Sequence, residues 1–372
     1  MIDFANLYFY PFFISCVLCL ILLPLIRWVA FKFGDWQPKR DRDLHKKAIP
    51  RWGGAAIILS FLIVVFLNTH LVIEKSLRGI IIAVVLILIF GLLDDLYEFS
   101  AKWQFFFQLL VILIVIFFGI HIDYITNPWG AIKNFFGLGS GGSEMIRLDY
   151  FKLSIAGFQL SVLGCLLIAF WLFLMMNAIN WFDGIDGLAC GISLFGFLVL
   201  FILSISALVN QPPLGIFSII MVGILLAFWI FNFPRKKGAY IFLGTSGSLF
   251  LGFMLGILSI FSGGKMGTAA FVLIVPILDA LWVVWQRWRH GMSIFAGDKN
   301  HLHHRLLNLG FSQRQIVFIF CSLSFLFGFV ALFLKTVGKM FLFLISIPII
   351  YICFVYIDKV SKNNSVEKYL DR

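Results

Sequence analysis

The stretch "IAGFQLSVLGCLLIAFWLFLMM" at 155–176 runs directly into "NAINWFDGIDGLA" at 177–189. The first part is apolar and long enough to cross a bilayer as one helix, which takes about 20 residues. The second part contains two Asn, two Asp and two Gly within a dozen residues. Because a charge inside hydrocarbon is costly, these polar side chains must lie at the membrane boundary or face an interior site.

Apolar runs of this kind recur along the whole chain. Of its 372 residues, 61% are hydrophobic and 13% are charged, and the mean hydropathy is +1.01. A soluble domain would have about a quarter of its residues charged, so this class is excluded. We predict an all-α polytopic membrane protein with about 10–11 transmembrane helices, forming a single domain over 1–372. The predicted spans are 7–29, 53–73, 78–93, 103–120, 156–178, 188–209, 214–232, 240–262, 268–286, 314–334 and 338–357.

The distribution of basic residues predicts the orientation. Most of the 29 Lys and Arg residues lie in alternate loops, which the positive-inside rule places in the cytoplasm, with the N-terminus outside. This topology accounts for the net charge of +11, so nucleic-acid binding is not needed to explain it. It makes 121–155 an extracytoplasmic loop, with 146–155 as a short strand pair, and 358–372 a short basic cytoplasmic tail. The six Cys residues lie in or beside the spans and are expected to pack as small apolar residues.

The residues able to do chemistry fall in the loops assigned to the cytoplasm. These loops contain "DRDLHKKAIPRWGGAAI" (41–57), "GLLDDLYEFSAKWQ" (91–104), the stretch at 177–189, "FNFPRKKGAYIFLGTSGSLFLG" (231–252) and "GDKNHLHHRLLNLGFS" (297–312). Structural polar groups would not segregate to one face in this way. The pattern therefore favours one active site at the cytoplasmic face.

Two adjacent acids, Asp94 and Asp95, end the third span. Neighbouring residues on a helix point about 100° apart, so the two carboxylates should serve different partners around one centre. An interfacial anchor is the alternative, but an acid at a helix C-terminus opposes the helix dipole, and a Lys would anchor better.

The next acids and amides follow a helical spacing. Asn177 and Asn180 lie three residues apart, and Asp183 and Asp186 repeat that spacing. Short carboxylates and amides beside glycines suit a hydrated cation or a polar ligand. The alternative is that these Asp residues, Asp186 included, cap the following helix.

The segment 300–310 reads as a short amphipathic helix, with Asn300 as its N-cap and Gly310 just beyond its C-terminus. His301, His303, His304 and Arg305 lie on it. Zinc is a weak alternative, because no Cys or nearby carboxylate completes an obvious set of ligands, and a purely interfacial helix is another. Imidazole and guanidinium groups fit an anionic phosphate better. Upstream, Lys46, Lys47 and Arg51 precede a helix start and fit either a lipid phosphate or a topological anchor.

Acids for a divalent cation and bases for phosphates, gathered at a bilayer boundary, match phosphoryl transfer to a lipid phosphate. The motifs "HKKAIPRWGG", "LLDDL", "NAINWFDGIDGLA", "GSLFLG" and "HLHHRL" resemble those of the polyprenyl-phosphate N-acetylhexosamine-1-phosphate transferases, the WecA/TagO branch of the MraY superfamily. They occur in family order over about 40–310. The resemblance implies transfer of N-acetylglucosamine 1-phosphate, or a similar hexosamine 1-phosphate, from a UDP-sugar to undecaprenyl phosphate. UMP would be released, as the first membrane step of a cell-envelope glycan such as lipopolysaccharide or teichoic acid.

The resemblance also implies roles for individual residues. The catalytic set is Asp94, Asp95, Asp183 and Asp186, with Asp94 orienting the lipid phosphate. The cofactor is Mg²⁺, with Mn²⁺ as a substitute, and its ligands come from Asp95, Asp186 and the position of Thr245. Substrate contacts fall to Lys46, Lys47, Arg51, Asn177, Asn180, Asn232, His301, His303, His304 and Arg305. The expected location is the bacterial inner membrane, and the family suggests a homodimer.

One position departs from the family pattern. Where the family usually has "GDxGS", this chain has "GTSGS", so that Thr245 stands in the place of an Asp that binds the metal. A neutral hydroxyl does not replace an anionic oxygen at equal affinity. Three alternatives follow: a disabled enzyme, a family member that binds lipid phosphate or nucleotide without catalysis, or a metal held by a neighbour such as Asp186. A transporter is less favoured, since the acids gather at one face and repeat symmetry is missing.

Overall fold

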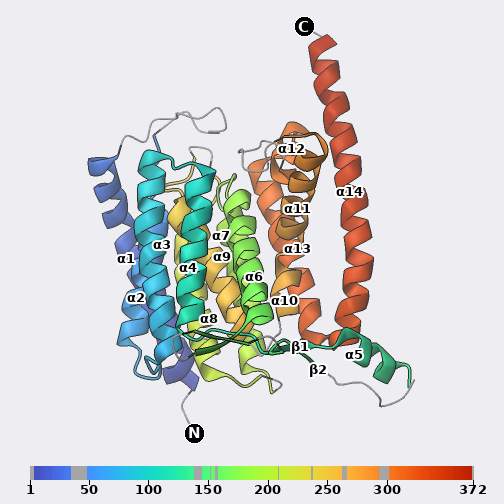
Figure 1. The fold of residues 1–372 in the computed structure, drawn as a ribbon. Coiled ribbons are helices and arrows are strands. Elements are labelled where there is room, and N and C mark those ends of the chain that lie inside the picture. Colours follow the sequence, from blue (N-terminus) through green and yellow to red (C-terminus); the bar gives the residue numbers. More distant parts are fainter. Residues whose placement is uncertain are drawn as a thin grey trace.

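A computed structural model describes residues 4–34, 48–137, 145–150, 152–155, 158–207, 209–235, 238–261, 266–292 and 301–370. Within these residues the regular structure is almost entirely helical, which confirms the predicted class (Figure 1). A π-helical segment, Ala5–Phe9, leads into the first helix. The helices are α1 (Tyr10–Phe33), α2 (Gly53–Leu67), α3 (Lys75–Tyr97), α4 (Ala101–Phe117), α5 (Pro128–Phe135), α6 (Val162–Phe182), α7 (Leu188–Ile205), α8 (Pro212–Asn232), α9 (Gly244–Phe261), α10 (Met266–Val272), α11 (Ile274–Arg289), α12 (Leu302–Asn308), α13 (Gln313–Phe333) and α14 (Thr336–Leu370).

The long helices coincide with the predicted spans. In the described part of the chain, 8 helices are long and apolar enough to cross a membrane, and α10 together with α11 would make a ninth. The helices α2 and α4 are apolar but shorter, at 15 and 17 residues. The last helix continues through 358–370, so the segment predicted as a separate tail extends α14.

The predicted span 268–286 is not one straight helix. It breaks at Leu273, and α10 and α11 meet at an angle of 78°. Pro276 gives the physical reason. It has no N–H to donate to the carbonyl of Val272, and its ring would clash with that carbonyl in a continuous helix.

The segment before α6 also differs from the prediction. The span expected from residue 156 begins only at Val162, because Phe158–Ser161 forms strand β4, and the Ser161 side chain caps the helix by accepting from the Gly164 N–H. The expected strand pair within 146–155 is wrong in its partners. Strand β2 (Met145–Arg147) pairs antiparallel with β1 (Tyr124–Thr126), whereas β3 (Lys152–Ile155) pairs antiparallel with β4.

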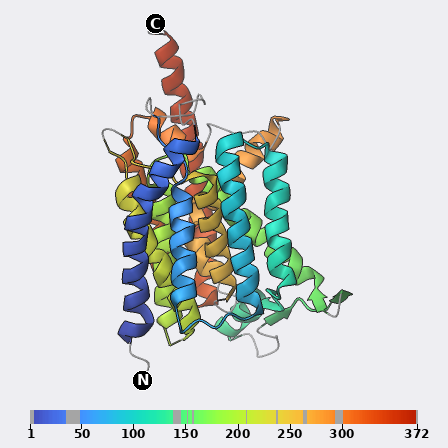
Figure 2. The ribbon, with the colours of Figure 1, turned by 90° about the vertical axis from the view of Figure 1, so that its left-hand side faces the viewer.

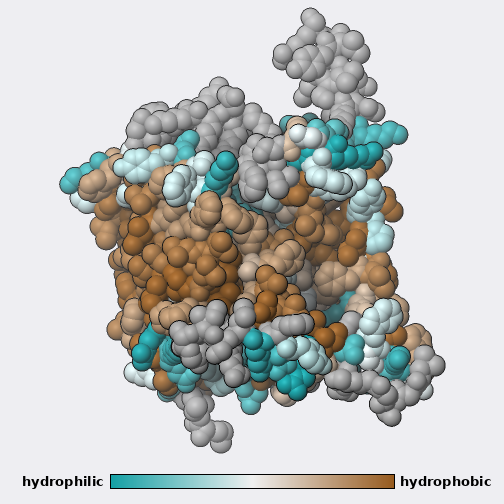
Figure 3. All heavy atoms as spheres, in the orientation of Figure 1, coloured by the Kyte–Doolittle hydropathy of each residue, from teal (hydrophilic) through white to brown (hydrophobic). Residues whose placement is uncertain are grey.

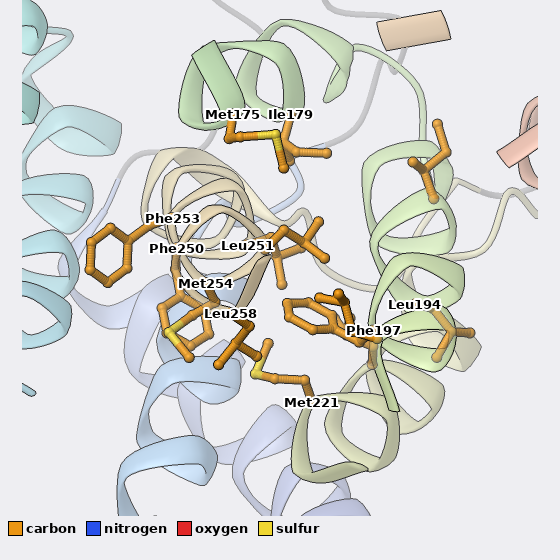
Figure 4. Close-up of a cluster of buried hydrophobic side chains, with 14 of the residues drawn as sticks. Met175, Ile179, Leu194, Phe197, Met221, Phe250, Leu251, Phe253, Met254 and Leu258 are labelled. Atoms are coloured by element: carbon orange, nitrogen blue, oxygen red, sulfur yellow. The ribbon is translucent and has the colours of Figure 1, made fainter. Parts of the chain in front are cut away.

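The centre of the bundle is α9, the most buried of the candidate spans. It packs against α2, α3, α6 and α7, and its apolar residues interlock with those of neighbouring helices (Figure 4). In that cluster Phe250 and Met254 of α9 lie near Met221 of α8 and Phe197 of α7. Glycines permit the close approach: a Cβ at Gly54 would collide with the backbone of Gly247.

The bundle has two different ends. Figures 1 and 2 place α12, the α3–α4 turn and the C-terminus at one end, and the N-terminus and the short strands at the other. Figure 3 shows a hydrophobic band around the middle with hydrophilic residues at both ends. Aromatic side chains such as Phe13 and Trp28 of α1 are exposed on the surface of the bundle, as expected for contact with lipid.

Candidate active site

The polar loops selected from the sequence meet at the α12 end of the bundle. They contribute the C-terminus of α3, the turn between α6 and α7, the residues before α2, the N-terminus of α9 and the helix α12. Polar side chains far apart in sequence contact one another there. Thr245 bonds to both acids of α3, although 150 residues separate it from Asp95.

Asp94 is buried and its carboxylate is fully engaged. One oxygen accepts from the Phe99 N–H at 3.1 Å and from the Gln104 amide at 3.0 Å. The other accepts from the Thr245 hydroxyl at 2.7 Å. Asp94 therefore joins the C-terminus of α3 to α4 and α9, and these donors stabilise its charge where the helix dipole does not.

Asp95 shares Thr245 with Asp94 but contacts the Thr245 backbone rather than the hydroxyl, so the prediction of different partners for the two acids is only partly confirmed. Its Oδ1 accepts from the Thr245 N–H at 3.0 Å, whereas its buried Oδ2 finds no hydrogen-bond partner among the described residues. Gly244 makes this contact possible. Its φ is +75°, and a Cβ there would collide with the Arg51 carbonyl and lie 2.6 Å from Asp95 Oδ2.

Asp183 lies just beyond the end of α6, and its carboxyl is influenced by the charge of Asp95. The pKa of its carboxyl is raised well above the usual range, first by desolvation and then by the charges of Asp95 and Asp186, against a smaller effect of Arg51. The Arg51 guanidinium in turn lies 3.8 Å from the Glu98 carboxylate. Among the described residues, Asp183 is thus exposed to the charges of two other carboxylates and of Arg51, which partly offsets them.

Asp186 and Asn232 hold the turn between α6 and α7. Asp186 accepts from the Ala239 N–H at 3.2 Å, and the N-cap of α7 is Gly187, so the interpretation of Asp186 as a cap is wrong. Gly187 takes that position because its φ is +75°. Asn232 accepts from the Gly187 N–H at 2.9 Å and donates to the Ile241 carbonyl at 3.0 Å. Asn232 thus links the α6–α7 turn to the segment before α9.

The two Asn residues of α6 face different neighbours. Asn177 donates to Gln108 of α4 at 2.6 Å and to the Phe173 carbonyl, which makes it part of a buried link between α6 and α4. Asn180 accepts from the Ser248 hydroxyl at 2.9 Å, and so joins α6 to the first turn of α9 beside Thr245. The structure therefore brings Asn180, but not the amide of Asn177, into contact with α9.

The helix α12 packs against the turn between α6 and α7. His303 is fully buried against it, and a Cβ at Gly184 would collide with the His303 Nε2. Neither of its ring nitrogens has a hydrogen-bond partner among the described residues. Burial, with smaller effects of His304 and His301, lowers its pKa well below the usual value, so this imidazole is neutral at pH 7.

Both ends of α12 are held by residues that sequence reasoning missed. The N-cap is His301, and the Asp279 carboxylate of α11 accepts both from the Leu302 N–H at 2.9 Å and from His301 Nδ1 at 2.8 Å. Arg305 donates to Gln286 at 3.0 Å and pairs with Asp358 of α14 at 3.2 Å. The C-terminus closes as predicted, with Gly310 at φ +94°.

A signal for Asp279 was present in the sequence. It is an acid within the predicted span 268–286, and ionisable residues inside membrane spans usually have a function. Gln104 and Ser248, the donors to Asp94 and Asn180, lie in the quoted stretches 91–104 and 231–252 but were not predicted as site residues. Lys46, Lys47 and Asn300 lie outside the described residues.

The acidic end of the site has the chemistry of a Mg²⁺ site. Asp95 keeps an unpaired carboxylate oxygen, and Asp183 is surrounded by like charge, so a divalent cation would relieve both. Among the described residues, no group of three or more His, Cys, Asp or Glu side chains converges as a ligand set. This fits Mg²⁺, which commonly takes one or two carboxylates and fills its other positions with water and substrate phosphates.

Comparisons with known proteins give the family of the chain. Residues 77–263 match the family described as Glycosyl transferase family 4. A Bacillus subtilis protein, the probable undecaprenyl-phosphate N-acetylglucosaminyl 1-phosphate transferase, is 31% identical over 91% of this chain and 88% of its own length. A Mycobacterium tuberculosis decaprenyl-phosphate N-acetylglucosaminephosphotransferase is 30% identical over 79% of this chain and 74% of its own. The Escherichia coli undecaprenyl-phosphate alpha-N-acetylglucosaminyl 1-phosphate transferase is 28% identical over 82% and 77%.

All three relatives bear transferase names, and they give no support to the alternative of a family member without catalysis. The match extends across the acids of α3, the α6–α7 turn and the N-terminus of α9. The chain belongs to glycosyl transferase family 4.

Proposed function

We propose that this protein transfers N-acetylglucosamine 1-phosphate from UDP-N-acetylglucosamine to undecaprenyl phosphate and releases UMP. The observation that carries the proposal is the unpaired Oδ2 of Asp95, beside Asp183 and Arg51, at a site closed by the His- and Arg-bearing helix α12. Acids that can hold a cation lie next to bases that can hold phosphates. The names of the relatives support the choice of sugar and lipid.

The reaction exchanges one phosphorus–oxygen bond for another. An oxygen of the lipid phosphate attacks the sugar-linked phosphorus of the UDP-sugar, and the bond from that phosphorus to the bridging oxygen breaks. UMP leaves with the electron pair, and a lipid diphosphate sugar forms. A phosphate monoester has its second pKa near 6, so the attacking oxygen is already largely ionised at pH 7. The protein therefore has no need of a general base, in keeping with an Asp94 carboxylate whose oxygens are occupied.

The residues of the site divide into three tasks. Asp95 and Asp183 are the carboxylates that would hold Mg²⁺, which neutralises the diphosphate and the departing UMP when bound. Arg51 and the side chains of His301, His304 and Arg305 are expected to bind phosphate oxygens. Asp94, Asp186 and Asn232 support the first two groups by fixing the backbone around them.

The setting follows from the apolar bundle and the bacterial relatives. We place the protein in the plasma (inner) membrane as a multi-pass protein, with the α12 end in the cytoplasm and the segment 121–155 outside. The homodimer suggested by the family stays a prediction, which light scattering of the purified protein in detergent would test.

The direct test is UMP release by the purified protein with UDP-N-acetylglucosamine, undecaprenyl phosphate and Mg²⁺. We expect turnover that needs all three components. Other UDP-hexosamines in parallel reactions define the sugar. Binding of the UDP-sugar without UMP release, for every sugar and with Mg²⁺ or Mn²⁺, would contradict the proposal.

A further inference from the structure

Asp279 is a buried acid in a helix that is otherwise apolar at this level. It is 1% exposed, and its neighbours in α11 include Leu278 and Ala280. An ionised carboxylate in such surroundings loses several kcal/mol of hydration unless it is well paired. Its two oxygens make two short contacts, both to the start of α12. The acid at position 279 is therefore explained by its two contacts with the start of α12.

The two contacts fix different things. Oδ1 accepts from the Leu302 N–H at 2.9 Å, and so satisfies the first free donor of α12. Oδ2 lies 2.8 Å from His301 Nδ1. Because an ionised carboxylate only accepts, His301 must carry a proton on Nδ1, and its ring is held in one orientation. Nε2 is then the ring nitrogen left for a ligand.

The held ring lies on the wall of the candidate active site. Its centroid is 6.0 Å from the ring of Trp181, in the last turn of α6 before the α6–α7 turn, and it lies parallel to the His303 ring at 5.8 Å. His303 packs on Gly184 of the same turn. A rotated or differently protonated His301 would present another atom to the substrate.

We propose that Asp279 is a positioning residue for the transfer reaction, which sets the tautomer and orientation of His301 through the Nδ1 contact. This inference rests on the proposed function for its kinetic consequence. The tautomer itself is a property of the protein alone.

The substitution Asp279→Asn tests the proposal directly. The Leu302 N–H cannot turn around, so the single amide oxygen of Asn must accept from it. The amide NH₂ then faces His301 Nδ1 and needs an acceptor, which moves the imidazole proton to Nε2. The helix keeps its cap while the ring changes its tautomer. Asp279→Glu keeps two accepting oxygens and should retain the Nδ1 proton.

The experiment combines spectroscopy with kinetics. In ¹⁵N-histidine NMR of the protein in detergent, the signal lost in His301→Gln identifies His301. We expect an Nδ1-protonated signal in the starting protein and in Asp279→Glu, and an Nε2-protonated signal in Asp279→Asn. The matched control is Asp358→Asn, which removes the other carboxylate anchor of α12 and should leave the His301 signal unchanged.

Kinetics separate positioning from mere support of the fold. Asp279→Asn should lower kcat/KM for the UDP-sugar by about 10- to 100-fold, as for other carboxylates that orient a functional His. In a protein that already carries His301→Gln, Asp279→Asn should lower kcat/KM by less than about 3-fold, because the His301 ring through which Asp279 acts is absent.

An unchanged tautomer in Asp279→Asn overturns the proposal, as do losses that multiply in the double variant. If Asp279→Asn fails to fold, Asp279→Glu provides the test, and loss of its Nδ1-protonated signal overturns the proposal. Absence of UMP release from the starting protein would refute the proposed function alone, since the tautomer is still measured.

Discussion

The two ends of the bundle handle charge in opposite ways. At the α12 end, acids from α3, α11 and the α6–α7 turn point inward and are bound by donors from distant elements. At the other end, Asp149 lies in the turn between β2 and β3 and pairs with its near neighbours Arg147 and Lys152. Local pairs of this kind stabilise little. Polar groups that bind across elements thus distinguish the end of the bundle where we propose the active site.

The largest expected difference between the two ends comes from the substitution Asp95→Asn. It removes the charge from the unpaired oxygen while keeping the acceptor for the Thr245 N–H, so the fold should survive. We expect UMP release to fall by about 10²–10³-fold, the usual loss of one key electrostatic group. Asp149→Asn at the opposite end is the control and should leave the rate unchanged; equal effects of the two variants would refute the contrast between the ends.

Gly244→Ala tests how tightly the site is built. The added methyl group would meet the Arg51 carbonyl, and a φ of +75° strains any residue with a Cβ, so the variant should lose about 1–3 kcal/mol of stability. Thermal unfolding in detergent measures the loss. The control is Gly267→Ala in α10, where a Cβ meets nothing within 4 Å among the described residues and should cost nothing. A stable Gly244→Ala protein would mean that the contact between α9 and the residues before α2 is loose.

The substitution Thr245→Asp tests whether a divalent cation binds at the acidic half of the site. A third carboxylate beside Asp94 and Asp95 should repel them without metal and attract a divalent cation. We expect the Mg²⁺ concentration for half-maximal thermal stabilisation to fall by about 10-fold, which corresponds to about 1.4 kcal/mol. Thr245→Val, which loses only the hydroxyl, should not show this gain. If all three proteins respond to Mg²⁺ alike, the metal lies away from residue 245.

The smallest expected effect concerns pH. His303 is buried and its folded-state pKa is depressed, whereas the unfolded chain titrates near 6.5, so the unfolded state binds more protons in acid. The contribution of His303 to stability is complete above that pH and declines below it, by roughly 0.8 kcal/mol at pH 6. His303→Leu should flatten the pH dependence of the unfolding temperature between pH 7 and 5.5. An identical slope in both proteins would place the buried titrating group elsewhere.

Much of this architecture was predictable because a bilayer imposes strict lengths and sidedness. The spans followed from apolar run length, and the meeting of "LLDDL", "NAINWFDGIDGLA" and the α12 segment at one end followed from counting crossings. The details that failed depend on tertiary contact. Pro276 did not mark a break in advance, because Pro24 and Pro348 lie inside the continuous helices α1 and α14. The strands at 145–161 alternate weakly, so the sequence did not specify their partners.

Within the site, residue type was predictable but the division of tasks was not. Asp94 and Asp95 are indistinguishable in sequence, yet donors from Phe99, Gln104 and Thr245 occupy one and leave an oxygen of the other unpaired. Which of two adjacent acids is available depends on side chains 10 and 151 positions away. Only the folded chain brings those donors together.

The pairing of Arg305 with Asp358 has a practical consequence for work on this protein. Asp358 lies about two thirds of the way along α14, and its carboxylate anchors Arg305. Shortening the chain to end before residue 358 would remove the end of α14 and, with it, the carboxylate that holds Arg305 of α12. A purification tag is better attached at the N-terminus, which emerges at the end of the bundle opposite α12.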